Sequence, residues 1–319
     1  MHQTVSKLAL ALAWGLLAIL PAAAQPAKPV RLVVPTPAGG PSDTAARTVA
    51  PALAKGLGQP VVVENRPGAG GAIAAQAVMT APPDGQTLLW GLASMAGLPV
   101  LQKSPPFRSM NELVPVAMVG RFAFALFVHP DVPARTVADL VAYGRTHPDK
   151  LNYGTGTLGE YMAMVQLLTA AGVSSVRVPY KGGVQLMPDL ITGRIQLNIG
   201  PVSSGMPHVK DGKLRMLAVL LPGRIGVAPD VPTLAESGVQ VSGLPTWQAI
   251  FAPPGTPTEV AERVSREVTR ALADPELRAK LEQQALQVQS ATREDLARIV
   301  AQDSETWRAF VRDHNVPQE

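Results

Sequence analysis

The residue types best suited to binding a ligand gather in three turns, each where a predicted strand runs into a predicted helix. The turns cover residues 35–43 (PTPAGGPSD), 154–159 (GTGTLG) and 200–205 (GPVSSG). Glycine lets the backbone approach a ligand closely, and the following helix presents unpaired N–H groups and the positive end of its dipole. Such turns bind carboxylates or phosphates. Three of them in one chain predict a cleft that binds a small anion.

The first candidate ligand-binding residues are members of these turns. They are Thr36, Ala38, Gly39, Gly40, Ser42, Asp43, Thr155, Gly156, Thr157 and Ser203. For Ser42 and Asp43 an alternative role stays open, because either side chain could simply cap the helix that begins there.

Residue patterns that would indicate catalysis are missing. The chain has five histidines and no cysteine, and no His pair stands at the spacing of a metal site. Without cysteine there is no disulfide, zinc–thiolate site or thiol nucleophile. G-x-S-x-G, S-x-x-K and P-loop patterns are also missing. We therefore expect no catalytic residues, no metal site and no enzyme.

The second turn matches the formal pattern G-x-G-x-x-G of dinucleotide-binding proteins. That fingerprint also requires an acidic residue about 20 positions further on. Between Glu160 and Asp189 the sequence contains neither Asp nor Glu. We therefore expect no NAD and no other cofactor, and we interpret this turn as a helix N-terminus with free N–H groups.

Composition excludes two further classes of protein. Among 319 residues, 46% are hydrophobic and 16% charged, with a net charge of +4. The hydrophobic share is ample for a large core, so the chain is not intrinsically disordered. A net charge this small gives little field to attract nucleic acid, and no nucleic-acid partner is expected.

Residues 1–24 have the pattern of a secretory signal peptide. Lys7 precedes an apolar run at 8–20 (LALALAWGLLAIL), and Ala22, Ala23 and Ala24 form a small-residue cleavage site. At 1.5 Å per residue this run spans about 20 Å, less than the roughly 30 Å hydrocarbon core of a membrane. Cleavage after Ala24 is therefore favoured over a membrane anchor, and the mature protein is expected to be exported and soluble.

After residue 24, short β-branched runs alternate with helical patterns, which predicts an α/β fold with mostly parallel sheets. From Thr258, a plausible N-cap, the pattern is purely helical. Helices without strands must pack on a sheet formed earlier. The C-terminal segment is therefore expected to return to the first domain.

Several segments, in chain order, carry a resemblance to a known family. RLVVPTPAGGPSDTAAR, LGQPVVVENRPGAGG and APPDGQTLL are similar to the opening of the Bug/TctC family, the periplasmic solute receptors of tripartite tricarboxylate transporters. The likeness continues through DKLNYGTG, VPYKGG, APDVPTLAESG and TWQAIFAPPGTP. It covers nearly the whole chain after the signal peptide.

The resemblance implies a two-lobed clamshell of the type II periplasmic-binding-protein kind, each lobe a sheet flanked by helices. Lobe one would combine 25–125 with 248–319, and lobe two would be 126–247. A small carboxylate-type metabolite would lie between them, held by the first and second turns. Tyr180 and Lys181 in VPYKGG would line the cleft, and Trp247 would cover the ligand. Alternatively, Tyr180 ends a strand, Lys181 is solvated and Trp247 packs in the core.

The implied partners are the small organic acid itself and the membrane permease subunits of a tripartite transporter, with the receptor acting as a periplasmic monomer. Two other functions stay open at this point. One is a ligand receptor for a sensor kinase, and the other is an α/β enzyme that acts on a small carboxylic acid.

The second turn departs from the family pattern, which is usually longer, rich in serine and ended by a His. Here Glu160 and Tyr161 follow it, and the third turn has Gly200 and Pro201 where an Asp is usual. If Glu160 faces the cleft, it would repel a second carboxylate, which favours a monocarboxylate or a ligand with an amine, amide or neutral ring. Alternatively, Glu160 points to solvent and is stabilised by the helix dipole.

Overall fold

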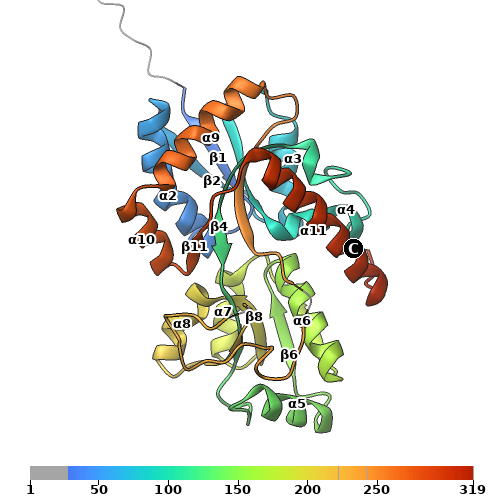
Figure 1. Ribbon diagram of the computed structural model, residues 1–319. Coiled ribbons are helices and arrows are strands. Elements are labelled where there is room, and N and C mark those ends of the chain that lie inside the picture. The colour runs from blue at the N-terminus through green and yellow to red at the C-terminus, as the bar shows by residue number, and fades with distance from the viewer. Residues whose placement is uncertain (1–27, 222, 242, 319) are drawn as a thin grey trace, which may run out of the picture.

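The computed structural model describes residues 28–221, 223–241 and 243–318, which form two lobes, one above the other in Figure 1. The predicted signal peptide, 1–24, lies outside the described residues. We call the six-stranded sheet with its helices lobe one, and the five-stranded sheet with its helices lobe two.

Lobe one has the strand order β11-β4-β10-β3-β1-β2. Its strands are β1 (Val30–Val34), β2 (Val61–Asn65), β3 (Thr87–Leu92), β4 (Val114–Phe122), β10 (Trp247–Ala252) and β11 (Leu286–Val288). Strands β2, β1 and β3 pair in parallel, and β10, β4 and β11 join antiparallel. The helices are α2 (Pro41–Leu57), α3 (Ala72–Met79), α4 (Leu98–Leu101), α9 (Thr258–Leu272), α10 (Pro275–Gln283) and α11 (Arg293–Asp313), with short 3-10 turns η2 (Ala69–Gly71), η3 (Ala93–Gly97) and η4 (Met110–Glu112).

Lobe two has the strand order β7-β6-β8-β5-β9. Its strands are β5 (Phe124–Val128), β6 (Asn152–Thr155), β7 (Val176–Pro179), β8 (Leu197–Pro201) and β9 (Arg215–Val219). Its helices are α5 (Val137–Thr146), α6 (Leu158–Ala171), α7 (Gly183–Ile191) and α8 (Val202–Lys210). Strands β7, β6 and β8 are parallel, and β5 is antiparallel to both of its neighbours. Because β6 and β8 run straight into α6 and α8, the second and third turns both lie at the carboxyl ends of parallel strands.

The chain passes between the lobes at Ala123, which joins β4 to β5, and returns ahead of β10. The Ala123 N–H donates to the Ala285 carbonyl at 3.1 Å, and its carbonyl accepts from Val202 at 2.8 Å. The lobe boundaries expected at 125/126 and 247/248 stay predictions. The six-stranded sheet itself ends β4 at Phe122 and begins β10 at Trp247.

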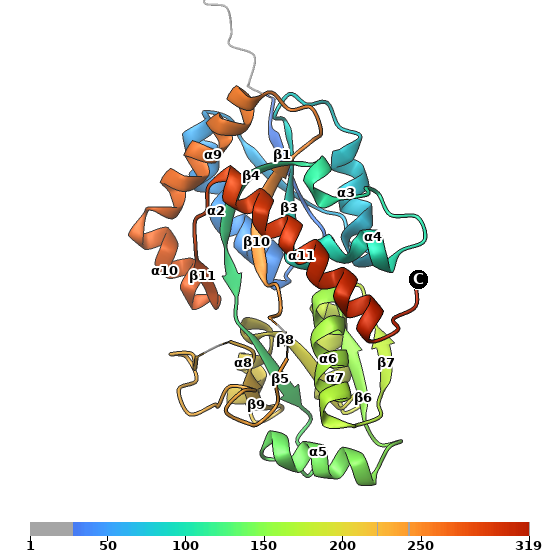
Figure 2. The same cartoon turned by 45° about the vertical axis from the view of Figure 1, so that its right-hand side comes forward.

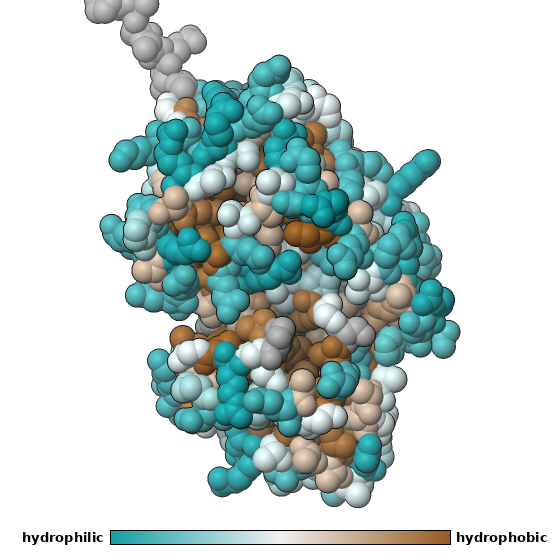
Figure 3. Space-filling view, viewed as in Figure 1, coloured by the Kyte–Doolittle hydropathy of each residue, from teal (hydrophilic) through white to brown (hydrophobic). Residues whose placement is uncertain are grey.

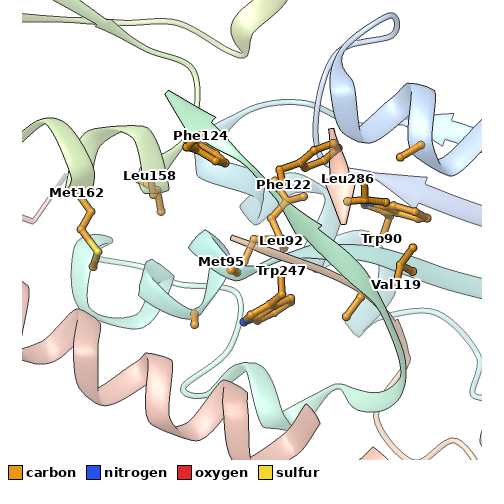
Figure 4. Close-up of a cluster of buried hydrophobic side chains, with 14 of the residues drawn as sticks. Trp90, Leu92, Met95, Val119, Phe122, Phe124, Leu158, Met162, Trp247 and Leu286 are labelled. Carbon is orange, nitrogen blue, oxygen red and sulfur yellow. The ribbon is translucent and has the colours of Figure 1, made fainter. Parts of the chain in front are cut away.

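The lobes pack against each other through one hydrophobic cluster. Figures 1 and 2 show α6 of lobe two standing beneath lobe one, where it contacts η3. The close-up in Figure 4 places Leu158 and Met162 of α6 in the same cluster as Met95, Phe122 and Trp247 of lobe one. The two lobes are therefore in direct contact in this structure, around the grooves and cavities that remain between them.

The two-lobed α/β class is confirmed, while both sheets are mixed rather than mostly parallel. The C-terminal segment is not purely helical, because Leu286 is buried as part of the edge strand β11, which pairs with β4. Three residues are too few to show a periodic pattern. The prediction of Thr258 as the N-cap of α9 was wrong. The N–H groups of Val260 and Ala261 donate to the carbonyl of Pro257, so the N-cap is Pro257, one residue earlier.

Gly97 lets α11 pack closely on η3. A Cβ built at Gly97 would lie 2.5 Å from Cδ2 of Trp307, a side chain that is fully buried. We expect Gly97→Ala to destabilise the protein by about 1–3 kcal/mol through overpacking, and to lower the midpoint of thermal unfolding by several degrees. Gly226→Ala is the matched control, because a Cβ there meets nothing within 4 Å. Equal midpoints for the two variants would show that this contact does not limit packing.

Candidate functional site

A carboxylate inside α2 holds the first turn in shape. Asp43 Oδ2 accepts the backbone N–H of Gly39 at 2.9 Å, while Oδ1 accepts from Arg47 Nε at 3.0 Å and Asn65 Nδ2 at 2.9 Å. Burial alone would raise the pKa of Asp43, but the hydrogen bonds from Arg47, Gly39 and Asn65 outweigh it and lower that pKa. Asp43 therefore stays ionised, and its oxygens are occupied by the protein.

The second turn is held in the same way. Thr157 is the N-cap of α6 and its hydroxyl accepts the N–H of Glu160, whose Oε2 accepts the N–H of Gly156 at 2.6 Å. Asn198 Nδ2 is 3.5 Å from the same oxygen. No Lys or Arg among the described residues forms an ion pair with Glu160. Burial therefore dominates and raises the pKa of Glu160 to about 7, against the opposing hydrogen bonds.

Glu160 does not point to solvent, because it is only 3% exposed. It lines a cavity of about 40 Å³ between the lobes, which we call the glutamate cavity. Ser42, Thr157, Trp247 and Gln248 also line it. In lobe one, the side-chain oxygen of Gln248 accepts hydrogen bonds from Ser42 Oγ at 3.0 Å and from the Trp90 indole N–H at 2.8 Å.

A second inter-lobe cavity, of about 80 Å³, lies where the first and second turns meet, and we call it the inner cavity. Its lining comprises Pro35, Thr36, residues 68–71, Leu92, Gly156, Thr157, Tyr180 and Lys181. The hydroxyl of Thr36 is buried and finds no hydrogen-bond partner among the described residues. An unpaired buried polar group is costly, so this hydroxyl is ready to bind a ligand atom.

A third space, the outer groove, is much larger, at about 570 Å³. It lies where the first turn faces the N-terminal ends of α7 and α8, and Gly39, Gly40 and Ser203 line it. Figure 3 shows hydrophobic residues gathered along the junction of the two lobes on the face seen in Figure 1.

The structure thus distributes the predicted residues over three neighbouring spaces. The inner cavity takes Thr36, Gly156, Thr157 and Tyr180; the glutamate cavity takes Ser42, Thr157, Glu160 and Trp247; the outer groove takes Gly39, Gly40 and Ser203. Ala38 and Asp43 line none of these spaces, because Ala38 is exposed and Asp43 holds its own turn. Thr155, whose hydroxyl accepts from Arg177 Nε at 3.0 Å, lines a further groove of about 550 Å³ between the lobes, together with Gly156, Thr157 and Tyr180.

Both predicted aromatic residues are fixed by carboxylates. Tyr180 donates to Asp189 Oδ2 at 2.7 Å, and burial together with this carboxylate raises the pKa of Tyr180 to about 12. Trp247 is fully buried, and its indole N–H donates to Asp303 Oδ2 at 2.6 Å. Trp247 is therefore a rigid wall of the glutamate cavity rather than a movable cover.

Lys181, which the family resemblance placed along the cleft, lines the inner cavity, as does the glycine-rich turn 68–71 of lobe one, which the sequence analysis missed. The available signal was the run NRPGAGG, which follows a strand as the other turns do. The residues that the structure describes contain no group of three or more His, Cys, Asp or Glu side chains that could hold a metal ion. In the same part of the chain, no helix is both long and apolar enough to cross a membrane.

Comparison with known proteins decides the family. The model of the tripartite tricarboxylate transporter family receptor, TctC, matches residues 45–316. This chain belongs to that family. Among curated relatives, Protein BugT of Bordetella pertussis is 33% identical over 306 residues, covering 94% of this chain and 93% of its own.

Solved structures of similar proteins agree. The periplasmic binding protein BugD is 30% identical with a TM-score of 0.86, covering 92% of this chain and 100% of its own. R. palustris Rpa4515, solved with adipate, is 30% identical with a TM-score of 0.87 and coverages of 92% and 99%. MatC of Rhodopseudomonas palustris, with bound malate, is 29% identical with a TM-score of 0.80 and coverages of 90% and 100%. These neighbours are solute-binding receptors, and this TctC-family chain is likewise a receptor and not an enzyme.

The buried carboxylate of Glu160 predicts a pH dependence of stability. Its pKa is about 7 when folded and near 4.5 ordinarily, so the folded state holds the proton more tightly. Wild-type stability should therefore fall as pH rises from about 4.5 to about 7, by up to about 3 kcal/mol from this group. Glu160→Gln removes the titration, and its amide oxygen can still accept the Gly156 N–H.

We expect the unfolding midpoint of Glu160→Gln, relative to wild type, to rise between pH 5 and pH 8.5. Thermal unfolding of both proteins across that range measures the difference directly. A difference that stays constant with pH would contradict the assigned environment of Glu160.

Proposed function

We propose that this protein captures a small carboxylate in the inner cavity and delivers it to the membrane permease subunits of a tripartite transporter. The observation that carries the proposal is the buried, unpartnered hydroxyl of Thr36 in a cavity walled by glycine turns from both lobes. In this proposal the chain is exported to the periplasm with loss of residues 1–24 and acts there as a monomer.

The chemistry of the inner cavity suits a carboxylate. Lys181 supplies a cation, the Thr36 hydroxyl can donate, and the glycine turns bring backbone close to the ligand. At about 80 Å³ the cavity has room for a small head group, and it adjoins a groove of about 550 Å³ with which it shares Gly70, Gly156 and Tyr180. The relatives solved with adipate and malate support the same class of ligand.

Glu160 narrows the ligand class. It lies in the glutamate cavity, which shares Thr157 with the inner cavity, so the far end of a ligand held at Thr36 would approach it. Above about pH 7 its charge would repel a second carboxylate, because no Lys or Arg among the described residues forms an ion pair with Glu160 to offset that charge. We infer that the preferred ligand is a monocarboxylate, or an acid whose other end carries an amine, amide or neutral ring.

Capture would work by closure of the lobes. The lobes touch where Gly182 meets Pro37 and where Gly70 meets Leu158, at distances that leave no room for a Cβ on either glycine. A ligand in the inner cavity contacts both lobes only in the closed form and so favours that form over an open one. The permease would then distinguish loaded from empty receptor by the relative position of the lobes.

Titration calorimetry of the chain without residues 1–24, at pH 8, tests this proposal. We expect small monocarboxylates and amine- or amide-bearing acids to bind more tightly than succinate or citrate. Thr36→Val should weaken binding by about tenfold to a hundredfold, because it removes a hydrogen bond to a charged group. Folding should be unaffected, since the hydroxyl has no protein partner among the described residues.

Thr146→Val, on an exposed position of α5 far from the cleft, is the matched control and should bind as wild type does. Glu160→Gln should raise succinate affinity relative to that of a monocarboxylate. Tight citrate or succinate binding by the wild type would contradict the ligand class. Unchanged binding by Thr36→Val would contradict the site.

A further inference from the structure

The outer groove is a wide space between the lobes, and the carboxylate of the proposed function does not need it. Its volume of about 570 Å³ falls in the range of small-molecule sites, roughly 300–1,000 Å³. It shares no lining residue with the inner cavity. The first turn separates the two, because Pro37 packs directly against Gly182.

Part of the lining of the outer groove is polar, and some of its buried polar atoms have no hydrogen-bond partner in the described part of the chain. Three buried atoms, Ser203 Oγ, His208 Nδ1 and Gln284 Oε1, have no hydrogen-bond partner among the described residues, and all three residues line the groove. Native structures rarely leave buried polar atoms unpaired. Three such residues around one space indicate that a polar group belongs there.

The polar side favours an anion. Helices α2, α7 and α8 all begin at this groove, and none of the three has a side-chain cap at its N-terminus. Their first-turn N–H groups and dipoles therefore favour negative charge in the space that they share. No Asp or Glu side chain lines the groove to oppose it.

Another part of the lining of the outer groove is apolar. Val184, Met187 and Ile191 come from successive turns of α7 and line it together. Val184 is 44% exposed, an unusual fate for a large hydrophobic side chain in a position that both lobes flank. A ligand with an aliphatic or aromatic body would cover this wall.

We propose that the outer groove is a second ligand site, for an amphipathic monocarboxylate. The carboxylate lies among the N-termini of the three helices beside Ser203, and the apolar body lies along the wall that Val184 begins. The lining comes from both lobes, so an occupant stabilises the closed form and is coupled to capture in the inner cavity.

Octanoate is a suitable probe, with octan-1-ol as its uncharged counterpart. Calorimetry on the chain without residues 1–24 should show saturable binding of octanoate and binding of octan-1-ol weaker by about tenfold or more. Val184→Asp should weaken octanoate about tenfold or more, because it places a negative charge at the anion site. An acidic residue in the first turn of α7 also suits the helix dipole, so the variant should fold.

Val227→Asp is the matched control, because Val227 is 56% exposed and does not line the groove. Its octanoate affinity should stay within about twofold of wild type, and unfolding midpoints check that both variants fold. Equal effects of the two substitutions, or no saturable octanoate binding, would overturn the proposal.

Thr36→Val separates this site from the inner cavity. It should leave octanoate binding within about threefold of wild type, the remaining change reflecting coupling through closure. If Thr36→Val abolishes octanoate binding, the probe occupies the inner cavity and the second site is excluded. Titration of the same protein with small monocarboxylates measures binding in the inner cavity independently. Either proposed site can therefore be contradicted without contradicting the other.

Discussion

The same type of hydrogen bond occurs once in each lobe and fixes the two turns that line the space between the lobes. In each lobe a carboxylate at the third position of a helix accepts the backbone N–H four residues earlier, Asp43 from Gly39 and Glu160 from Gly156. A glycine turn is entropically costly to hold in one conformation, and the buried acceptor holds it against the helix that follows. Both turns line the inner cavity and the glutamate cavity, and the first turn also lines the outer groove.

The two carboxylates differ in what surrounds them, and this difference moves their pKa values in opposite directions. Arg47 compensates the charge of Asp43, and Asn65 donates a further hydrogen bond to it. Glu160 accepts from Asn198 and from its own helix turn but forms no ion pair with a Lys or Arg of the described residues, so burial raises its pKa to about 7. In the proposed function, the first turn would bind the carboxylate of the ligand, and Glu160 behind the second turn would limit what the other end of the ligand can be.

The local features of this cleft could be predicted from the sequence, and its long-range features could not. The strand-to-helix turns, their glycines and the acidic residues behind them follow from nearby sequence, and family resemblance supplied the two-lobed arrangement. The turn at 68–71 lines the inner cavity together with residues of lobe two that lie far from it in the sequence. The indole N–H of Trp247 donates to Asp303, 56 positions away in the sequence. The short strand β11 forms by pairing with the edge of β4. No local pattern encodes such pairings.

A crystal structure of the chain without residues 1–24, grown with a monocarboxylate that binds tightly by calorimetry, tests the central claim most directly. The account predicts the carboxylate in the inner cavity, with one oxygen within about 3 Å of the Thr36 hydroxyl and contacts to both the first and second turns. A ligand held by one lobe alone, or a carboxylate bound away from Thr36 with that hydroxyl still unpaired, would contradict it.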